Sequence, residues 1–227
     1  MAAAGIEDIL IANEVIGRRK IERLMDLAAR CDIMVAVDDP RNLADLDAAA
    51  AVHKVRPRVL VEVNIGHNRC GVSPAAAVNL ARAATEAEHL RFRGLMGYEG
   101  HVIDLEDREE RENGAHECIQ RLVDARTDLE SAGLDCEICS ASGTGDYYIS
   151  TRFDGITEVQ AGSYALMDSA YGKLGLGFKN ALRVLTTVTS RPSPEQVITD
   201  AGLKSLTPEH SFPSVVDRPD LECHALS

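Results

Sequence analysis

The fold is decided by the stretch VLVEVNIGHNRCGVSPAAAVNLARAATEAEHLRFRGLMGY, residues 59–98. It begins with the apolar, β-branched run Val59–Val63 and ends with a second such run, Phe92–Tyr98, and runs of this length are typical of strands. Ser73 and Pro74 stand between them, where a helix would begin, because Ser is a favoured N-cap and Pro is tolerated at the first helical position. The stretch therefore predicts a strand, a helix and a second strand in that order.

The same alternation continues on both sides of this stretch. Further strands are predicted at Asp8–Ala12, Ile33–Val37, Cys136–Ser140 and Ile156–Gln160. Helical patterns, with apolar residues at 3.6-residue spacing, run from Ile21 to Ala28 and from Ile119 to Leu129. The predicted strands are apolar nearly throughout, which is typical of strands buried on both faces. These features predict a parallel sheet covered by helices.

The predicted fold class is α/β, an incomplete TIM-type (β/α)8 barrel followed by the start of a β-rich C-terminal domain. A closed barrel takes eight strand and helix units over about 250 residues. This chain shows six strands clearly and a candidate seventh at Tyr164–Met167. Further along, Ala181–Val188 and Val197–Asp200 alternate with polar residues and are predicted to be antiparallel strands. We therefore expect a partial barrel at residues 1–178 and the beginning of a second domain at residues 179–227.

Charge and composition exclude several classes of partner. The 227 residues contain 24 Lys plus Arg and 36 Asp plus Glu, a net charge of −12, which repels nucleic-acid phosphates and anionic lipid. The apolar runs have the length of strands, and the first residues lack the basic and long apolar regions of an export signal. We expect no nucleic-acid or membrane partner and a cytoplasmic location.

The six cysteines are expected to be reduced thiols, since no export signal precedes them. Cys136 and Cys139 form a C-x-x-C, which is also found in zinc and redox sites. No second Cys or His pair accompanies them, and they fall on a predicted buried strand. We therefore interpret them as small core residues.

The functional groups of a parallel barrel lie just after the carboxyl ends of its strands, which directs attention to four loops. In the first loop, Gly66 and Gly71 bracket Arg69, whose guanidinium is suited to hold an anionic oxygen; the alternative is a surface arginine. In the second loop, Tyr98 is suited to stack on a planar ring, and His101 is suited to act as a base near neutral pH. The alternative is a tyrosine that packs under its own loop and a solvated histidine.

The other two loops are rich in glycine and hydroxyl residues. Ser140–Gly145 reads SASGTG, and Glu158–Tyr164 reads EVQAGSY. The backbone N–H groups of such loops point together at a phosphate, and Ser and Thr hydroxyls add donors, although generic flexible loops share this composition. Two glycine-bearing strand ends late in one barrel are the usual place for the phosphate of a cofactor.

At these four loops the sequence resembles the fold-type III pyridoxal-phosphate enzymes related to D-threonine aldolase, D-serine dehydratase and the barrel domain of alanine racemase. The segments that carry the resemblance, in the order of the family, are VEVNIGHNRCGV (61–72), GLMGYEGH (94–101), SASGTGDY (140–147) and TEVQAGSYALMD (157–168). The D-threonine aldolase-like branch fits better than the racemase branch. The resemblance implies a pyridoxal 5′-phosphate-dependent lyase that cleaves small-molecule D-3-hydroxy amino acids to glycine and an aldehyde. Dehydration of such substrates is the alternative.

The resemblance implies a role for each matched position. Arg69 would hydrogen-bond the phenolic oxygen of the cofactor ring, Tyr98 would lie against the ring, and Gln160 would sit near the pyridine nitrogen. His101 is implied as the catalytic base, although several aldolases of this group place their histidine where this chain has Asp104. The residues expected around the cofactor phosphate are Ser142, Gly143, Thr144, Gly162 and Ser163.

The resemblance also implies features that these residues do not contain. The Schiff-base lysine of the family ends the first barrel strand, upstream of this chain. The lysines present match neither that position nor its motif: Lys20, Lys54, Lys173, Lys179 and Lys204. The divalent metal of D-threonine aldolase-like members is held by a His and an Asp or Cys in a part of the β domain beyond Ser227, so no metal ligand is expected here.

We therefore expect these residues to be the middle of a longer protein. By themselves they are expected to be inactive and to form no lysine-linked adduct with added pyridoxal phosphate. Three alternatives stay open: a non-catalytic barrel that binds pyridoxal phosphate, an inert fragment, and a phosphate-binding barrel enzyme unrelated to pyridoxal. The resemblance further implies a homodimer.

Overall fold

The computed structural model describes residues 1–103, 105–209 and 211–227, which form two compact units, Met1–Gln160 and Ala161–Ser227. The first unit contains a six-stranded parallel sheet in the order β1-β2-β3-β4-β5-β6. Its strands are β1 (Asp8–Glu14), β2 (Asp32–Val37), β3 (Arg58–Glu62), β4 (Arg91–Met96), β5 (Ile138–Ala141) and β6 (Glu158–Val159). Its helices are a short 3-10 helix (Ala2–Ala4), α1 (Arg18–Ala28), α2 (Pro40–His53), α3 (Pro74–Glu86), α4 (Arg108–Ser131) and α5 (Tyr147–Ser150).

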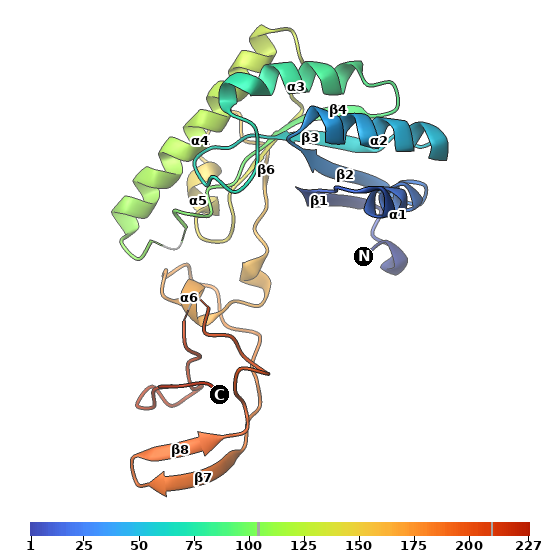
Figure 1. Ribbon diagram of the computed structural model, residues 1–227. Coiled ribbons are helices and arrows are strands. Elements are labelled where there is room, and N and C mark those ends of the chain that lie inside the picture. The colour runs from blue at the N-terminus through green and yellow to red at the C-terminus, as the bar shows by residue number, and fades with distance from the viewer. Residues whose placement is uncertain (104, 210) are drawn as a thin grey trace. The chain divides into compact units, whose positions relative to one another are not determined.

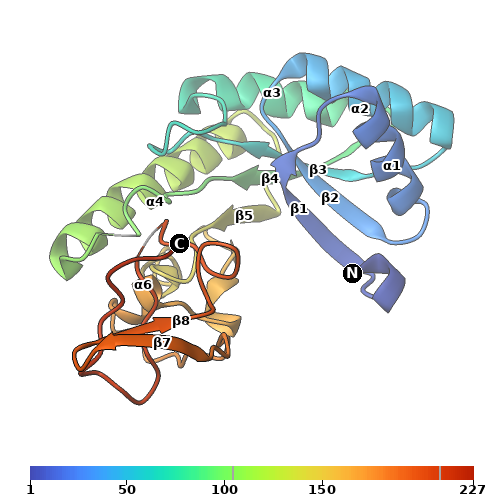
Figure 2. The same ribbon diagram turned by 60° about the horizontal axis from the view of Figure 1, so that its bottom comes forward.

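The sheet is curled, and the long helices α1 to α4 lie on its outer side (Figures 1 and 2). All six predicted strands are present and parallel, so the predicted α/β class and incomplete barrel are confirmed. The observed strand limits differ from the predicted ones by up to two residues at most ends. Parallel pairing brings the carboxyl ends of all the strands to one edge of the sheet, which is where the candidate site lies.

Both faces of the sheet are buried at the central strands β2 and β3, as the continuous apolar runs predict. Val35 and Val61 belong to the core that packs under the helices, and neither is exposed to solvent. Met34 and Leu60 are the alternate residues of the same strands and form a second cluster on the inner face. Because side chains alternate along a strand, two apolar faces require apolar residues at nearly every position.

Helix α2 is a feature that the sequence analysis missed. Asp39 caps it, accepting hydrogen bonds from the backbone N–H groups of Arg41 at 2.7 Å and Asn42 at 3.4 Å, and Pro40 occupies its first position. An acidic N-cap followed by proline is a typical helix start, so the signal was present. The alanine-rich helix is only weakly amphipathic, and this hid its period.

The second unit contains the 3-10 helix Ser163–Ala165, α6 (Ser169–Gly172), β7 (Val188–Ser193) and β8 (Gln196–Thr199). β7 and β8 pair as an antiparallel hairpin, as expected for the start of a β-rich domain. The candidate strand Tyr164–Met167 is wrong, because the backbone turns there and Ala165 N–H donates to the Gly162 carbonyl. The strand predicted at Ala181–Val188 is also wrong: β7 begins only at Val188, and its register with β8 leaves the preceding apolar residues without a partner strand in the described part of this unit.

The cysteines behave as the sequence analysis expects. All six are free, and Cys136 and Cys139 are buried core residues of the first unit. None of the helices that the structure describes combines the length and the hydropathy that a membrane crossing requires.

Gly94 fixes the contact between β4 and β5. It pairs with Ile138, its φ angle is +142°, and a Cβ atom at this position would overlap the carbonyl oxygen of Ile138. The register between β3 and β4 also shifts here, between Val59 and Leu60. Only glycine meets both the backbone angle and the close approach without moving the strands.

We predict that Gly94→Ala lowers the free energy of unfolding by about 3 kcal/mol or more, because the strands must separate to admit the methyl group. Gly133→Ala is the matched control: Gly133 also has a positive φ, +76°, but its missing Cβ would meet nothing within 4 Å. Gly133→Ala should therefore lower the free energy of unfolding only by the cost of the left-handed backbone, about 1–2 kcal/mol. Urea unfolding of the two variants measures the difference, and equal losses would contradict the proposed strand contact.

Candidate functional site at the carboxyl edge of the sheet

The register of the parallel strands aligns the residues that form the site. The paired residues Glu62, Met96, Ser140 and Glu158 lie in one row across β3, β4, β5 and β6. Two residues further along each chain segment come Asn64, Tyr98, Ser142 and Gln160. Because the side-chain period of a strand is two, this second row continues the inner face at the carboxyl edge.

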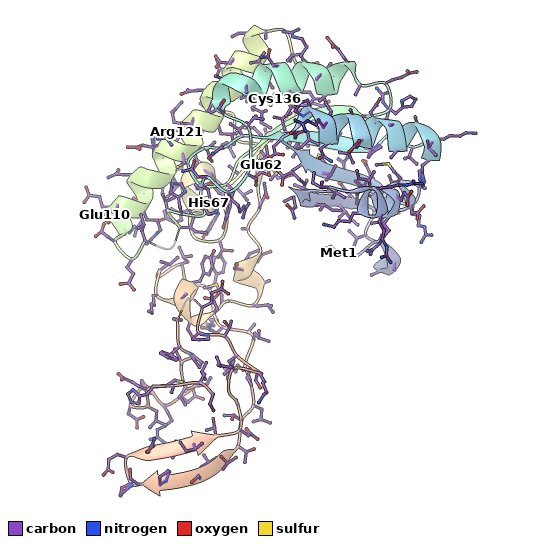
Figure 3. The ribbon with its side chains drawn as sticks, in the orientation of Figure 1. Met1, Glu62, His67, Glu110, Arg121 and Cys136 are labelled. Atoms are coloured by element: carbon purple, nitrogen blue, oxygen red, sulfur yellow. The ribbon has the colours of Figure 1, made fainter. Side chains whose placement is uncertain are left out.

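Tyr98 is the centre of the site. The Arg69 guanidinium carbon lies 5.2 Å from the centroid of the Tyr98 ring, and the His67 ring meets it edge-on with centroids 5.7 Å apart. A Cβ added to Gly143 would lie 3.5 Å from the Tyr98 ring, so this glycine stands directly beside it. The loops after β3, β4 and β5 thus converge on one aromatic ring; Glu62 and His67 mark the region in Figure 3.

The loop that carries Arg69 is closed by its own hydrogen bonds. The Asn64 N–H donates to the carbonyl of Val72 at 2.8 Å, and the Asn64 side-chain oxygen accepts from the Gly66 N–H at 3.1 Å. Gly71 has a φ of +96° and lies so close to the backbone of Asn64 that a Cβ would approach its nitrogen to 2.6 Å. Its N–H donates to Asp38 at 2.9 Å. These contacts hold Arg69 at the carboxyl edge of the sheet.

A buried carboxyl group lies behind Arg69. The Glu62 side chain is 4% exposed, and its Oε1 is 4.0 Å from an Arg69 nitrogen. The Cys70 thiol donates to the same Oε1 at 2.8 Å. The pKa of Arg69 is raised, first by its hydrogen bond with Cys70, so the guanidinium stays charged. Burial and the bond to Glu62 raise the pKa of the Cys70 thiol to about 11, which keeps this cysteine protonated at neutral pH.

Glu14, at the end of β1, forms a group with Glu62 and Cys70. The ligand atoms of these three residues lie within 4.8 Å of one another, a spacing at which side chains of this kind can hold a metal ion. One oxygen of each glutamate is buried and accepts no hydrogen bond within the described residues. The pKa of Glu14 is raised to about 7, first by burial and then by Glu62, with Asp38 adding to the effect. Burial and the neighbouring acids thus favour the protonated form of Glu14.

The loop after β5 is held from behind by two carboxyl groups. The Ser142 hydroxyl donates to Glu99 at 2.5 Å, and the Ser142 N–H donates to the other Glu99 oxygen at 3.4 Å. The Gly143 N–H donates to Asp146 at 2.9 Å. Thr144 follows and is 1% exposed. Ser142 and Gly143 therefore direct these donors toward the protein, and their predicted place at a phosphate stays a prediction.

Gln160 and His101 have neighbours that bear on their predicted roles. The Gln160 side-chain amide donates to the Ser140 hydroxyl at 3.0 Å, and that hydroxyl donates to Glu158 at 2.6 Å. His101 is exposed, its ring centroid lies 5.8 Å from that of His67, and its Nε2 lies 3.8 Å from the Cys118 sulfur. His67 is therefore a neighbour of both His101 and Tyr98. Asp104 lies outside the described residues.

The structure brings Arg69, Tyr98 and Gly143 together around one point. Gly162 and Ser163 belong to the second unit, and their predicted contact with a phosphate stays a prediction. No strand of the first unit carries a lysine: Lys20 lies in α1, and Lys54 caps the end of α2.

Sequence analysis gave no role to His67, to the half-buried Glu14 or to the buried acids Glu62, Glu99 and Asp146. Glu62, Glu99 and Asp146 each stand in an otherwise apolar or small-residue segment near a strand end, which is the signal that could have found them. His67 sits between Gly66 and Arg69 in a motif that was already singled out. Its pKa is lowered, first by burial and then by Arg69 and His101, which favours the neutral imidazole.

Comparison with known families gives two matches along the chain. The family described as the N-terminal domain of alanine racemase matches residues 2–170. A family described as a putative serine dehydratase domain matches residues 181–227. Both agree with the resemblance that the four loops carry.

Individual relatives point to the same group. A D-threonine aldolase of Arthrobacter sp is 40% identical over 99% of this chain and 61% of its own length. A 3-hydroxy-D-aspartate aldolase of Paracoccus denitrificans (strain Pd 1222) is 38% identical over 97% of this chain and 60% of its own. The chain thus spans about 60% of the length of these curated relatives.

A solved structure confirms the fold. The crystal structure of D-threonine aldolase from Filomicrobium marinum matches with a TM-score of 0.97 and 39% identity, over 100% of this chain and 62% of that chain. A D-threo-3-hydroxyaspartate dehydratase from Delftia sp. HT23 matches with a TM-score of 0.77 and 27% identity, over 88% of this chain and 54% of that chain.

We predict that Glu14→Gln flattens the dependence of stability on pH. The pKa of Glu14 is raised from 4.5 to about 7 in the folded protein, so the folded state holds a proton that the unfolded chain has released. The free energy of unfolding should therefore fall as the pH rises from about 4.5 to 7, and it should fall less in Glu14→Gln. Urea unfolding across this range measures it, with Glu86→Gln on the exposed side of α3 as control. The same slope in the native protein and in Glu14→Gln would contradict the raised pKa of Glu14.

Proposed function

The chain belongs to the family of the alanine racemase N-terminal domain, and from this we propose that it is the cofactor-binding part of a pyridoxal 5′-phosphate-dependent lyase. The reaction we propose is the cleavage of a D-3-hydroxy amino acid to glycine and an aldehyde. The observation that carries the proposal is the convergence of Arg69, Tyr98 and Gly143 on one point. The 40% identity to a D-threonine aldolase supports the choice of reaction.

The residues present fit a planar, anionic cofactor ring. Tyr98 offers an aromatic face at the carboxyl edge of the sheet, and the Arg69 guanidinium stands over that ring. Gly143 has no side chain that would fill the space beside Tyr98. A planar ring with a phenolic oxygen requires an aromatic surface to pack against, a cation to bind the oxygen, and space beside the backbone for the ring.

When bound, pyridoxal phosphate supplies a ring that accepts the charge left on the α-carbon as the bond to the β-carbon breaks. Arg69 is proposed to donate to the phenolic oxygen of the ring. Glu62 and Cys70 hold this arginine from behind, so its position is set before any ligand arrives. A donor fixed in this way costs no reorganisation during the reaction.

Other residues are proposed to set the ring and to move the substrate proton. Tyr98 packs against the ring, and the neutral amide of Gln160 lies toward the pyridine nitrogen. His101 is proposed as the base that removes the proton of the β-hydroxyl group. The ring of His67 neighbours both His101 and Tyr98, and its lowered pKa favours the neutral imidazole beside the proposed base.

Dehydration of the same substrates is the second candidate. Residues 181–227 match a family described as a putative serine dehydratase domain, and a D-threo-3-hydroxyaspartate dehydratase of Delftia sp. (strain HT23) is 29% identical over 90% of this chain. Both reactions use the same ring-binding residues, so Arg69 and Tyr98 do not decide between them. A divalent metal held by residues outside this chain, and a homodimer, stay part of the proposal.

We predict that these residues support lyase activity when they replace the matched 61% of the Arthrobacter D-threonine aldolase in a chimera. The chimera should release glycine and an aldehyde from D-threonine and leave L-threonine unchanged. Arg69→Ala should lower its kcat/KM by about 100-fold or more, because the ring loses its anchored donor. Arg18→Ala, an exposed arginine on α1, is the matched control and should leave kcat/KM unchanged.

Three results would count against the proposal. Release of a 2-oxo acid and ammonia from the chimera would assign the dehydratase reaction instead. A folded chimera that consumes neither D-threonine nor D-3-hydroxyaspartate would contradict both reactions. An active chimera that tolerates Arg69→Ala would remove Arg69 from the site.

A further inference from the structure

Two carboxyl groups are completely buried behind the loop that follows β5. Glu99 and Asp146 are both 0% exposed. No arginine or lysine forms an ion pair with either of them in the part of the chain that the structure describes. Two ionised carboxylates side by side without a cation would be strongly unfavourable in a buried place, because neither water nor a counter-ion offsets their charge.

The hydrogen bonds show where a proton belongs. Both oxygens of Glu99 accept from Ser142, one from its hydroxyl and one from its N–H. Asp146 Oδ1 accepts from the Gly143 N–H, whereas Asp146 Oδ2 is buried and has no partner within the described residues. A carboxylate oxygen can only accept, but a protonated one donates. A proton on Asp146 Oδ2 would satisfy this atom and leave every other bond in place.

We propose that Asp146 is a neutral carboxylic acid that donates a hydrogen bond to Glu99, and that this pair fixes the conformation of the loop at Ser142 and Gly143, beside which the phosphate of the cofactor is proposed to bind. Glu99 and Asp146 are positioning residues, since they act through the loop. The last part of the proposal rests on the proposed function, whereas the protonation of Asp146 does not.

The electrostatic surroundings agree with a protonated acid. Burial, followed by the interaction with Glu99, raises the pKa of Asp146 to about 9. From α4, Cys118 interacts with both acids, and its pKa is raised to about 11 mainly by burial, whereas Arg121 acts on Cys118 and lowers that pKa. His101, in the loop after β4, lies with its Nε2 3.8 Å from the Cys118 sulfur. None of these residues donates a hydrogen bond to Asp146 Oδ2.

The protonated pair has a consequence for phosphate binding. A phosphate at this loop brings close to two negative charges at neutral pH. Two ionised carboxylates directly behind the loop would repel it, whereas one neutral acid and one hydrogen-bonded carboxylate repel it much less. Binding of a phosphate-bearing ligand should therefore require that Asp146 keep its proton.

Asp146→Asn tests the protonation without any ligand. The amide keeps an oxygen for the Gly143 N–H and adds an N–H group directed at Glu99, so it copies the neutral acid. The folded state binds a proton that the unfolded chain releases above about pH 4, and native stability should therefore fall as the pH rises toward about 9. Asp146→Asn should thus raise the melting temperature at pH 8, and the gain should shrink toward pH 4.

A lower melting temperature for Asp146→Asn at pH 8 would overturn the proposal, because it would mean that an ionised Asp146 stabilises the loop. Asp154→Asn, at an exposed aspartate, is the matched control and should show no such dependence on pH.

The carboxyl carbon of Asp146, followed by NMR, should titrate far above the usual range of aspartate. Glu99→Gln should move that titration to lower pH, because the negative neighbour is gone; no movement would separate Asp146 from Glu99.

A binding measurement tests the link to phosphate. The affinity of the native chain for pyridoxal 5′-phosphate should fall about tenfold or more between pH 8 and pH 10, as Asp146 loses its proton. Asp146→Asn should remove this fall, and pyridoxal, which lacks the phosphate, should not show it. An equal fall in both proteins would overturn the link. If the chain binds no pyridoxal phosphate at all, the proposed function and the link to phosphate fail together, and the melting and titration experiments still decide the protonation.

Discussion

The parallel pairing of β3, β4 and β5 is the constraint on which the candidate site depends. The carboxyl ends of parallel strands lie at the same edge of the sheet. Because Glu62, Met96 and Ser140 are paired across the three strands, the loops that follow these residues begin side by side at that edge. Arg69, Tyr98 and Gly143 are far apart in the sequence and meet only because of this register. Gly94 permits the close approach of β4 and β5 that the register requires. A slip of one residue in any of the three strands would turn its inner row toward the helices.

Buried acids support the functional side chains from behind. Glu62 forms an ion pair with Arg69. Glu99 accepts hydrogen bonds from Ser142, and Asp146 accepts one from the Gly143 N–H. A buried acid is costly unless it is paired or protonated, so each one marks a place where position is fixed at the expense of stability. The site therefore consists of two layers, with exposed groups suited to a ligand and a buried layer that sets their geometry.

The sequence predicts much of the fold because the strands are short apolar runs separated by clear turns. Prediction from the sequence fails where contacts with other segments, rather than local composition, determine the secondary structure. Tyr164–Met167 has the composition of a strand but turns into a 3-10 helix after Gly162, and α2 lacks a strong amphipathic period. The glycines and the place after strands predict four loops, and the structure brings three of them, those after β3, β4 and β5, together at Tyr98. The pairs Glu62 with Arg69 and Glu99 with Ser142 were not, because each acid acquires its role only when a second segment packs against it.

A pyridoxal phosphate ring is proposed to bind at the carboxyl edge of the sheet, around Tyr98. The most direct test is an amide NMR titration of the isotope-labelled chain with pyridoxal 5′-phosphate. We predict that the signals of Arg69, Tyr98 and Thr144 shift together and saturate with one affinity, while the signal of Phe153 beside α5 stays unmoved. Shifts confined to surfaces away from the strand ends, or shifts at only one of the three loops, would contradict it.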